Sequence, residues 1–143
     1  MIVVDTNVIS EMLKPEPDSA VYAWLRSQPT ASVFTTAVSR SEIKYGIAIM
    51  PKGKRRSGLL TAATLIFEDD FKDRILPFDL EAADIYAAIA SDRRLAGQPI
   101  SQLDAQIAAI TASRGGRLAT RNVRDFVNCG IDIVNPWDAR VKP

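Results

Sequence analysis

The sequence has 143 residues, a formal net charge of +1, one cysteine and no histidine. The absence of histidine excludes a Ser-His-Asp triad, a Cys-His pair, a histidine general base and a zincin-type metal site. The lone Cys129 excludes an internal disulfide and a multi-cysteine zinc site. Any chemistry must therefore use carboxylates, amides, hydroxyls, Lys or Arg.

The composition, with 47% hydrophobic and 24% charged residues, is that of one soluble globular domain. No apolar run approaches the roughly 18 residues that a membrane span needs, and the first residues lack the basic region and cleavage site of a signal peptide. We therefore expect a cytoplasmic protein that does not contact a membrane. Because the net charge is near zero, any nucleic-acid binding has to depend on local basic patches.

Apolar runs, caps and turn residues predict strands and helices in regular alternation. The β-branched residues 2–4 are typical of a strand that is buried on both faces of a parallel sheet. Next come, in chain order, helices at about 8–13 and 18–28, a strand at 32–36, helices from 39 and at about 57–68, an edge strand at 74–78, helices at about 80–96 and from 101, and strands at 117–120 and 131–134. This order predicts a single three-layer α/β/α domain over residues 1–143, with a short, mostly parallel sheet.

Three polar residues, Asp5, Thr6 and Asn7, directly follow the first predicted strand. Ligands of open α/β sheets collect at the carboxyl ends of the strands, so Asp5 is a candidate reactive carboxylate. Asp is also a favoured helix N-cap, and one carboxylate is able to do both jobs. This position alone does not decide between the two interpretations.

Two further acids also have both a structural and a functional interpretation. Glu42 lies three residues after Ser39, the spacing of a capping box. Helical geometry nevertheless turns Glu42 toward the apolar side, where an unpaired carboxylate is costly. Asp104 lies three residues after Ser101, in a first helical turn where the helix dipole favours an acid.

Several acidic residues are predicted at strand ends or in first helical turns, which share one rim of a doubly wound sheet. The candidate catalytic residues are Asp5, Glu42, Asp104 and Asp125, and the polar residues expected between them are Thr6, Asn7, Thr120 and Asn122. Ionised carboxylates repel one another in a small site unless a cation compensates their charge. A hard, oxygen-ligated ion such as Mg²⁺ or Mn²⁺ is the natural candidate.

A basic turn at residues 51–56 is either a solvated loop or a patch that contacts phosphates. Positive charges near the predicted site would guide a polyanion toward an otherwise negative pocket. The candidate contacts to a polyanion such as RNA are Lys52, Lys54, Arg55, Arg56, Arg121 and Arg124.

Four motifs occur in order: Val-Val-Asp-Thr-Asn-Val-Ile at 3–9, Ser-Glu-Ile at 41–43, Leu-Asp-Ala-Gln-Ile-Ala-Ala at 103–109 and Ala-Thr-Arg-Asn-Val-Arg-Asp-Phe at 119–126. Together they resemble the PIN domain, and more narrowly the VapC/FitB-type toxins of bacterial toxin–antitoxin pairs. The resemblance spans about residues 1–137. It implies a Mg²⁺- or Mn²⁺-dependent endoribonuclease that hydrolyses RNA phosphodiester bonds through metal-activated water.

The resemblance also implies roles for individual residues. Asp5 and Asp104 match the principal metal ligands of the family, and Glu42 matches its third acid. Family members often have a fourth acid directly after Thr-Arg, where this chain has Asn122, whereas Asp125 matches the acid that related members carry before Phe. We expect Asp125 to complete the acidic pocket and Asn122 to bind substrate or water. The supporting groups that orient the carboxylates would be Thr6, Asn7 and Thr120.

The partners that the resemblance implies are an RNA substrate and a cognate antitoxin protein that occupies a groove and blocks the site. It further implies a homodimer within a larger toxin–antitoxin complex. DNA would be contacted only through the antitoxin.

Two other functions stay open. A catalytically weak PIN-fold module would bind RNA or an antitoxin without cutting, and Asn122 keeps this interpretation open. An Asp-nucleophile phosphatase would use Asp5, but such enzymes carry a second Asp two residues on, where this chain has Asn7. A Rossmann or P-loop nucleotide site is disfavoured because no glycine-rich loop follows the first strand.

Overall fold

The structure, a computed structural model, describes residues 1–138. The last residues of the predicted domain, 139–143, lie outside the described residues. Its sheet contains five strands in the order β3-β2-β1-β4-β5, and every pair of neighbours is parallel. The strands are β1 (Ile2–Val4), β2 (Val33–Thr36), β3 (Ile75–Leu76), β4 (Arg117–Ala119) and β5 (Asp132–Val134). The predicted parallel sheet and the edge position of β3 are confirmed.

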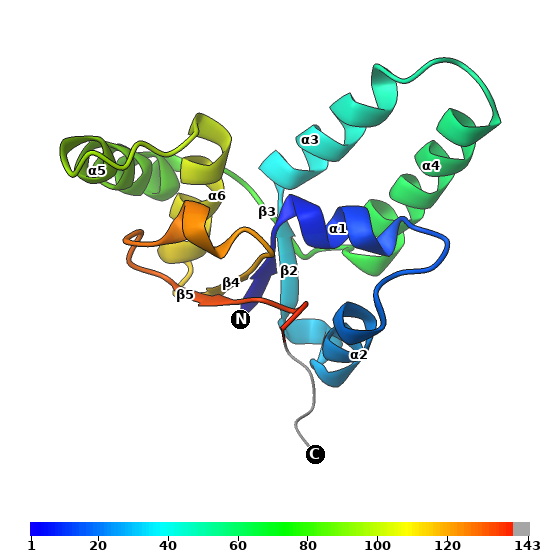
Figure 1. Ribbon diagram of the computed structural model, residues 1–143, viewed down its shortest axis with the longest axis horizontal. Helices are drawn as coiled ribbons and strands as arrows, with labels where there is room; N and C mark the ends of the chain where they lie inside the picture. Colours follow the sequence, from blue (N-terminus) through cyan, green and yellow to red (C-terminus); the bar gives the residue numbers. More distant parts are fainter. Residues whose placement is uncertain (139–143) are drawn as a thin grey trace.

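Helices cover both faces of this sheet (Figure 1). They are α1 (Thr6–Met12), α2 (Ser19–Ser27), α3 (Ala37–Ala48), α4 (Lys54–Leu65), α5 (Leu80–Leu95) and α6 (Gln102–Ser113). Figure 1 shows α1, α3 and α4 on one side of the sheet and α5 and α6 on the other. Short 3-10 turns, η1 (Thr30–Ser32) and η3 (Val123–Phe126), and a π-helical turn, η2 (Ile66–Asp70), complete the fold. The predicted three-layer α/β/α domain is confirmed.

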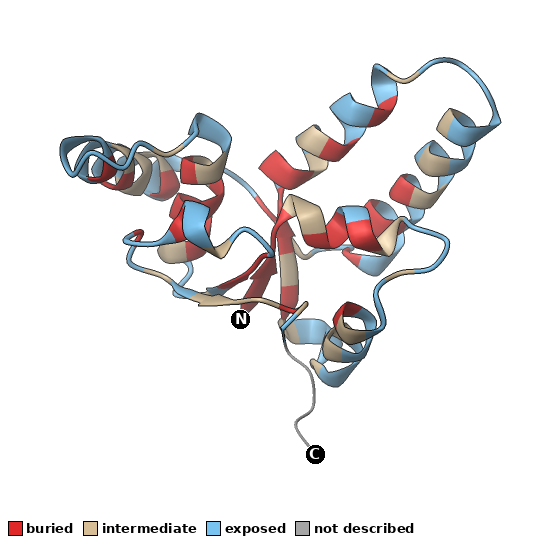
Figure 2. Cartoon of the chain, viewed as in Figure 1, coloured by how far each residue is buried: buried red, intermediate tan, exposed pale blue. Residues whose placement is uncertain are grey.

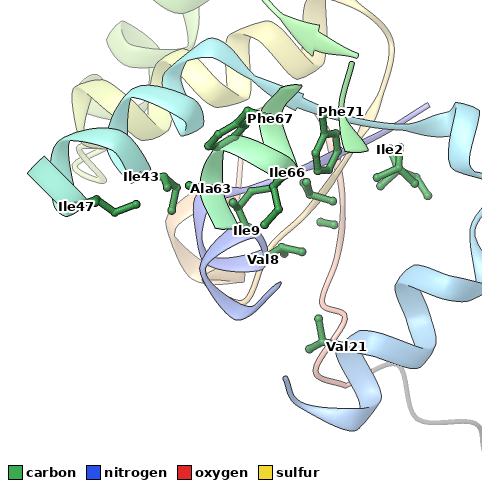
Figure 3. Packing of buried hydrophobic residues seen from close by; sticks show 13 residues of the cluster. Ile2, Val8, Ile9, Val21, Ile43, Ile47, Ala63, Ile66, Phe67 and Phe71 are labelled. Atoms are coloured by element: carbon green, nitrogen blue, oxygen red, sulfur yellow. The ribbon is translucent and has the colours of Figure 1, made fainter. Parts of the chain in front are cut away.

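The central strand divides the core in two because successive side chains of a strand point to opposite faces. Ile2 and Val4 belong to a cluster with α1, α2, α3, α4 and η2, whereas Val3 belongs to a cluster with α5 and α6. Figure 3 shows side chains of the first cluster converging from several helices on one face of the sheet. Figure 2 shows that buried residues follow the strands and that the loop between α3 and α4 is mostly exposed.

The first residues of two helices differ from the prediction in a way that affects the site. The hydroxyl of Thr36 accepts a hydrogen bond from the backbone N–H of Ser39 at 3.0 Å, so Thr36 is the N-cap of α3. The predicted capping box between Ser39 and Glu42 is therefore wrong, and Glu42 has no capping role. Helix α4 begins at Lys54, three residues earlier than predicted, so part of the basic turn is helical.

None of the helices within residues 1–138 combines the length and the hydrophobicity that a membrane span requires.

Candidate functional site

Three carboxylates from distant parts of the sequence line one cavity of about 230 Å³ at the carboxyl edge of the sheet. We call it the acid cavity; its lining residues are Asp5, Thr6, Asn7, Ser10, Glu42, Asp104 and Asn122. These residues come from the β1–α1 junction, from α3, from α6 and from the loop after β4. The order of the strands brings them together, because β1 lies between β2 and β4.

Asp5 lies deepest, with 4% of its surface exposed. Its Oδ1 accepts a hydrogen bond from the backbone N–H of Thr6 at 2.8 Å, so Asp5 also caps α1. Its Oδ2 accepts hydrogen bonds from the hydroxyl of Thr120 at 2.8 Å and from the amide of Asn7 at 3.3 Å. Burial raises the pKa of Asp5 to about 6, and the negative charges of Asp104 and Glu42 add to this effect, while the Thr120 and Thr6 hydrogen bonds oppose it.

Glu42 is connected to α1 through Thr6. The hydroxyl of Thr6 donates to Glu42 Oε1 at 2.8 Å, and the same hydroxyl oxygen lies 2.9 Å from the hydroxyl oxygen of Ser39. Glu42 is partly exposed toward the acid cavity. Its carboxylate is thus held from one side and is accessible from the other.

Asp104 occupies the first turn of α6, where its backbone N–H donates to the hydroxyl of the N-cap residue Ser101 at 3.2 Å. Burial is the main cause that raises the pKa of Asp104, and the charge of Asp125 acts in the same direction. A hydrogen bond from Ser101 and the positive charge of Arg93 lower it. The pKa of Asp104 therefore depends both on its burial at the cavity and on charges outside it, including that of Asp125 in the loop after β4.

The loop after β4 places Asn122 and Asp125 differently. Asn122 lines the acid cavity, and its backbone N–H donates to the hydroxyl of Thr120 at 3.0 Å. Asp125 is exposed and does not line the cavity. The structure thus places Asn122, and not Asp125, in the lining of the cavity with the three acids, because η3 begins directly after Asn122 and carries Asp125 away.

Two predicted supporting residues form a network behind Asp5. The amide of Asn7 donates to the Thr120 hydroxyl at 3.1 Å, and its carbonyl oxygen accepts from the backbone N–H of Arg121 at 3.3 Å. Thr120 is fully buried. These contacts tie the end of β4 to the start of α1, which fixes the orientation of the Asp5 carboxylate.

Sequence reasoning missed three residues. Ser10 lines the acid cavity, and its position one turn after Thr6 on α1 is a signal that could have revealed it. Ser39 was interpreted only as a cap, although its side chain contacts Thr6. Arg93 is 6% exposed and donates to the backbone carbonyls of Gln98, Asp125 and Val127; these long-range contacts leave no signal in the local sequence.

The chemistry of the cavity fits a hard divalent cation, because its charged ligands are all carboxylate oxygens. Within residues 1–138 no group of three or more His, Cys, Asp or Glu side chains is placed to hold a metal ion by itself. Mg²⁺ usually binds through one or two carboxylates and keeps several water molecules. A volume of about 230 Å³ leaves room for such waters.

The predicted RNA-contacting residues lie at different distances from the cavity. Lys54 and Arg55 line a larger hollow next to it, and Arg121 lies over the ring of Trp137, 5.2 Å from its centroid. Arg56 is turned toward α3, where its Nε donates to the carbonyl of Ile47 at 3.2 Å. Lys52 and Arg124 are exposed.

The larger hollow has a volume of about 750 Å³ and lies between α1, α3 and α4; we call it the helix groove. Its walls are mostly apolar and include Leu13, Ile43, Ile47, Leu59 and Ala62. The helix groove and the acid cavity share Thr6, Ser10 and Glu42. An occupant of the groove would therefore lie directly against Glu42, at the border of the acid cavity.

Comparison with known proteins places this geometry in a family. The chain is 40% identical over 138 residues to VapC ribonuclease Y4jK of Sinorhizobium fredii, and the alignment covers 96% of this chain and 99% of that protein. It is 37% identical over 137 residues to toxin FitB of Neisseria gonorrhoeae, with coverage of 96% and 99%. Among solved structures, FitAB bound to an IR36 DNA fragment matches with a TM-score of 0.90 and 36% identity over 99% of both chains. The PIN domain matches residues 2–129, and this chain therefore belongs to the PIN domain family.

Proposed function

We propose that this protein is a divalent-metal-dependent endoribonuclease and the toxin of a toxin–antitoxin pair that acts in the cytoplasm. The observation that carries the proposal is the convergence of Asp5, Glu42 and Asp104 on one cavity in a PIN-domain chain. The relatives named VapC ribonuclease and toxin FitB support the same activity and role.

In this proposal Asp5, Glu42 and Asp104 would hold a Mg²⁺ or Mn²⁺ ion. When bound, such an ion would supply a water molecule of lowered pKa and compensate negative charge on the scissile phosphate. Asp5 contributes a carboxylate whose orientation is fixed by Thr120, Asn7 and the Thr6 backbone. Because it is fixed before substrate binds, little reorganisation is needed during the reaction.

Asn122 lines the acid cavity at the position where related proteins often carry a fourth acid. A carboxylate at this position would repel an RNA phosphate, whereas an amide donates a hydrogen bond to it without that repulsion. We assign Asn122 to substrate or water binding. Asp125 acts from outside the cavity through its charge on Asp104.

The RNA backbone approaches over basic residues at the helix groove and in the loop after β4. Lys54 and Arg55 line the helix groove, and Arg121 lies two positions after the end of β4. Phosphate contacts of this kind position RNA without reading its sequence.

The antitoxin segment occupies the helix groove. Its apolar walls suit the apolar face of a peptide helix or strand. Because Thr6, Ser10 and Glu42 line both hollows, an occupant would cover Glu42 and border the acid cavity. The relative FitB is part of FitAB, which was solved with DNA. We extend this arrangement to the present chain as a homodimer whose antitoxin makes the DNA contact.

The test is a cleavage assay on total RNA with antitoxin-free protein and Mn²⁺. Asp5→Asn and Asp104→Asn should each lower cleavage by about 100-fold or more, and excess chelator should abolish it, because the ion loses a ligand or is removed. Asp132→Asn is the matched control, because Asp132 is exposed at the amino end of β5, away from the cavity. Identical RNA profiles for wild type and Asp5→Asn would leave only a module that binds RNA or antitoxin without cutting.

A further inference from the structure

Three hydroxyl groups form a continuous series of hydrogen bonds that ends at Glu42, and we call this series the relay. The hydroxyl oxygens of Thr36 and Ser39 are 3.3 Å apart, and those of Ser39 and Thr6 are 2.9 Å apart. The Thr6 hydroxyl oxygen is 2.8 Å from Glu42 Oε1. The relay connects the end of β2, the first turn of α3 and the start of α1.

The direction of these hydrogen bonds follows from counting protons. A hydroxyl has one proton to donate, and a carboxylate oxygen has none, so the contact between Thr6 and Glu42 uses the Thr6 proton. The contact between Thr6 and Ser39 then has to use the Ser39 proton. The remaining contact uses the Thr36 proton, while the Thr36 oxygen accepts from the Ser39 backbone N–H at 3.0 Å. All three protons therefore point toward Glu42.

Ordinary helix chemistry explains Thr36 but not the side chain of Ser39. Thr36 is the N-cap of α3, which is a common role for Thr. Hydroxyls inside helices usually donate to a carbonyl one turn back, as Ser41 of the same helix does to the Val38 carbonyl at 2.7 Å. Ser39 instead contacts only the side chains of Thr6 and Thr36 through its hydroxyl. The Ser39 hydroxyl is therefore part of the relay that leads to the acid cavity.

The inner part of this relay is buried, whereas Thr6 is partly exposed. Thr36 and Ser39 have no exposed surface, so water does not replace either partner. Successive hydrogen bonds in a buried chain polarise one another. Only one oxygen of Glu42, Oε1, receives a hydrogen bond from the part of the protein that the structure describes, which leaves Oε2 for a ligand of the acid cavity.

We propose that Ser39 is a positioning residue that acts with Thr36 through Thr6 to fix the Glu42 carboxylate for its ligand. The inference rests on the proposed metal-dependent function for its consequence in catalysis. The geometric part, that Ser39 holds Glu42 in place, concerns the metal-free protein as well. The two parts are tested separately.

The first test uses metal affinity. We expect Ser39→Ala to weaken Mn²⁺ binding by about 10-fold, the lower end of what loss of an outer-shell partner costs. In a Glu42→Ala background the same substitution should change the affinity less than about 2-fold, because its effect passes through Glu42. An equal loss in both backgrounds would show a merely structural role and overturn the proposal.

A matched pair of substitutions separates the relay from general damage to the core. Thr36→Val and Thr35→Val change neighbouring, fully buried residues of β2 in the same way. Thr35 lies outside the relay, since its hydroxyl donates to the Val4 carbonyl at 3.1 Å. Only Thr36→Val should weaken Mn²⁺ binding, and melting temperatures of both variants control for folding. Equal effects of the two variants would contradict the relay.

The second test needs no metal and no activity. Crystal structures of metal-free wild type and Ser39→Ala should differ at Glu42, whose contact with Thr6 should be kept in the wild type and lost or divided among rotamers in the variant. An unchanged Glu42 would overturn the proposal even if the nuclease is active. If the wild type binds no Mn²⁺ but Glu42 moves in the variant, the proposed function fails and the positioning role of Ser39 stands.

Discussion

At Asp5, burial and hydrogen bonding act in opposite directions. The buried position raises the pKa to about 6, although Thr120 and Thr6 stabilise the ionised form by donating hydrogen bonds. At neutral pH the protein therefore holds an ionised carboxylate in a place that disfavours it, beside two further acids. A bound cation would offset this cost, which links the stability of the fold to the occupancy of the acid cavity.

The pH dependence of unfolding tests this conclusion. The pKa of Asp5 is higher in the folded protein, about 6, than the ordinary value of 3.8. The folded state therefore binds this proton more tightly, and the resulting stabilisation is present below about pH 4 and is lost as the pH rises through 6. A shift of this size corresponds to about 3 kcal/mol.

The measurement is urea unfolding in chelator for the wild type and Asp5→Asn. Carboxylates far from the acid cavity titrate equally in both proteins, so the difference between their free energies of unfolding reports Asp5 together with its coupling to Glu42 and Asp104. We expect the wild type to lose stability relative to Asp5→Asn between about pH 4 and pH 7. A difference that stays constant with pH would mean that Asp5 is ionised at no cost.

At the level of elements, the sequence predicted helices well where a single cap residue was available. Asp79 and Ser101 accept hydrogen bonds from the third residues of α5 and α6, as their positions indicated. The predicted start of α3 was wrong because Thr36 and Ser39 are both suitable N-cap residues. Thr36, which has an extended backbone at the end of β2, is the N-cap in the structure. The geometry of the loop after β4 was not predictable, because it depends on Arg93, more than thirty positions away.

Arg93 provides a test at this scale. Its guanidinium lies 3.0 Å from the Asp125 carbonyl and 2.7 Å from the Val127 carbonyl, and its Nε donates to the Gln98 carbonyl at 2.6 Å. Arg93→Met would leave these carbonyls without their donor, so we expect a loss of about 2–4 kcal/mol in the free energy of unfolding. The loop that carries Asn122 should loosen as well, which lowers cleavage.

The neighbouring residue supplies the control for this measurement. Arg94→Met makes the same substitution one position later on α5, at an exposed site, and should stay within about 0.5 kcal/mol of the wild type. Chemical denaturation measures the free energy of unfolding of both variants. Similar stabilities for the two would show that Arg93 does not hold the loop.

At the scale of the whole molecule, a net charge of +1 conceals a strong local asymmetry. Three acids face one cavity, while Lys54 and Arg55 lie at the edge of the adjoining helix groove. In the proposed function this arrangement would separate two tasks, since the acids would attract a cation and the bases would attract the RNA backbone. The lysine and arginine are in the first turn of α4, where the helix dipole disfavours positive charge. They therefore do not stabilise the helix through its dipole, which agrees with the proposed role in RNA binding.

Salt dependence of RNA binding tests that assignment. Each phosphate contact contributes about 0.7 to the slope of log affinity against log salt for single strands. In an Asp104→Asn background that does not cut, Lys54→Ala with Arg55→Ala should therefore flatten the slope by between about 1 and 2.

Arg56 is left intact because it holds the Ile47 carbonyl. Arg117→Ala removes one charge at the exposed amino end of β4, the opposite edge of the sheet, and should leave the slope unchanged. If the double variant keeps the wild-type slope, Lys54 and Arg55 are solvated side chains, and RNA reaches the acids by another route.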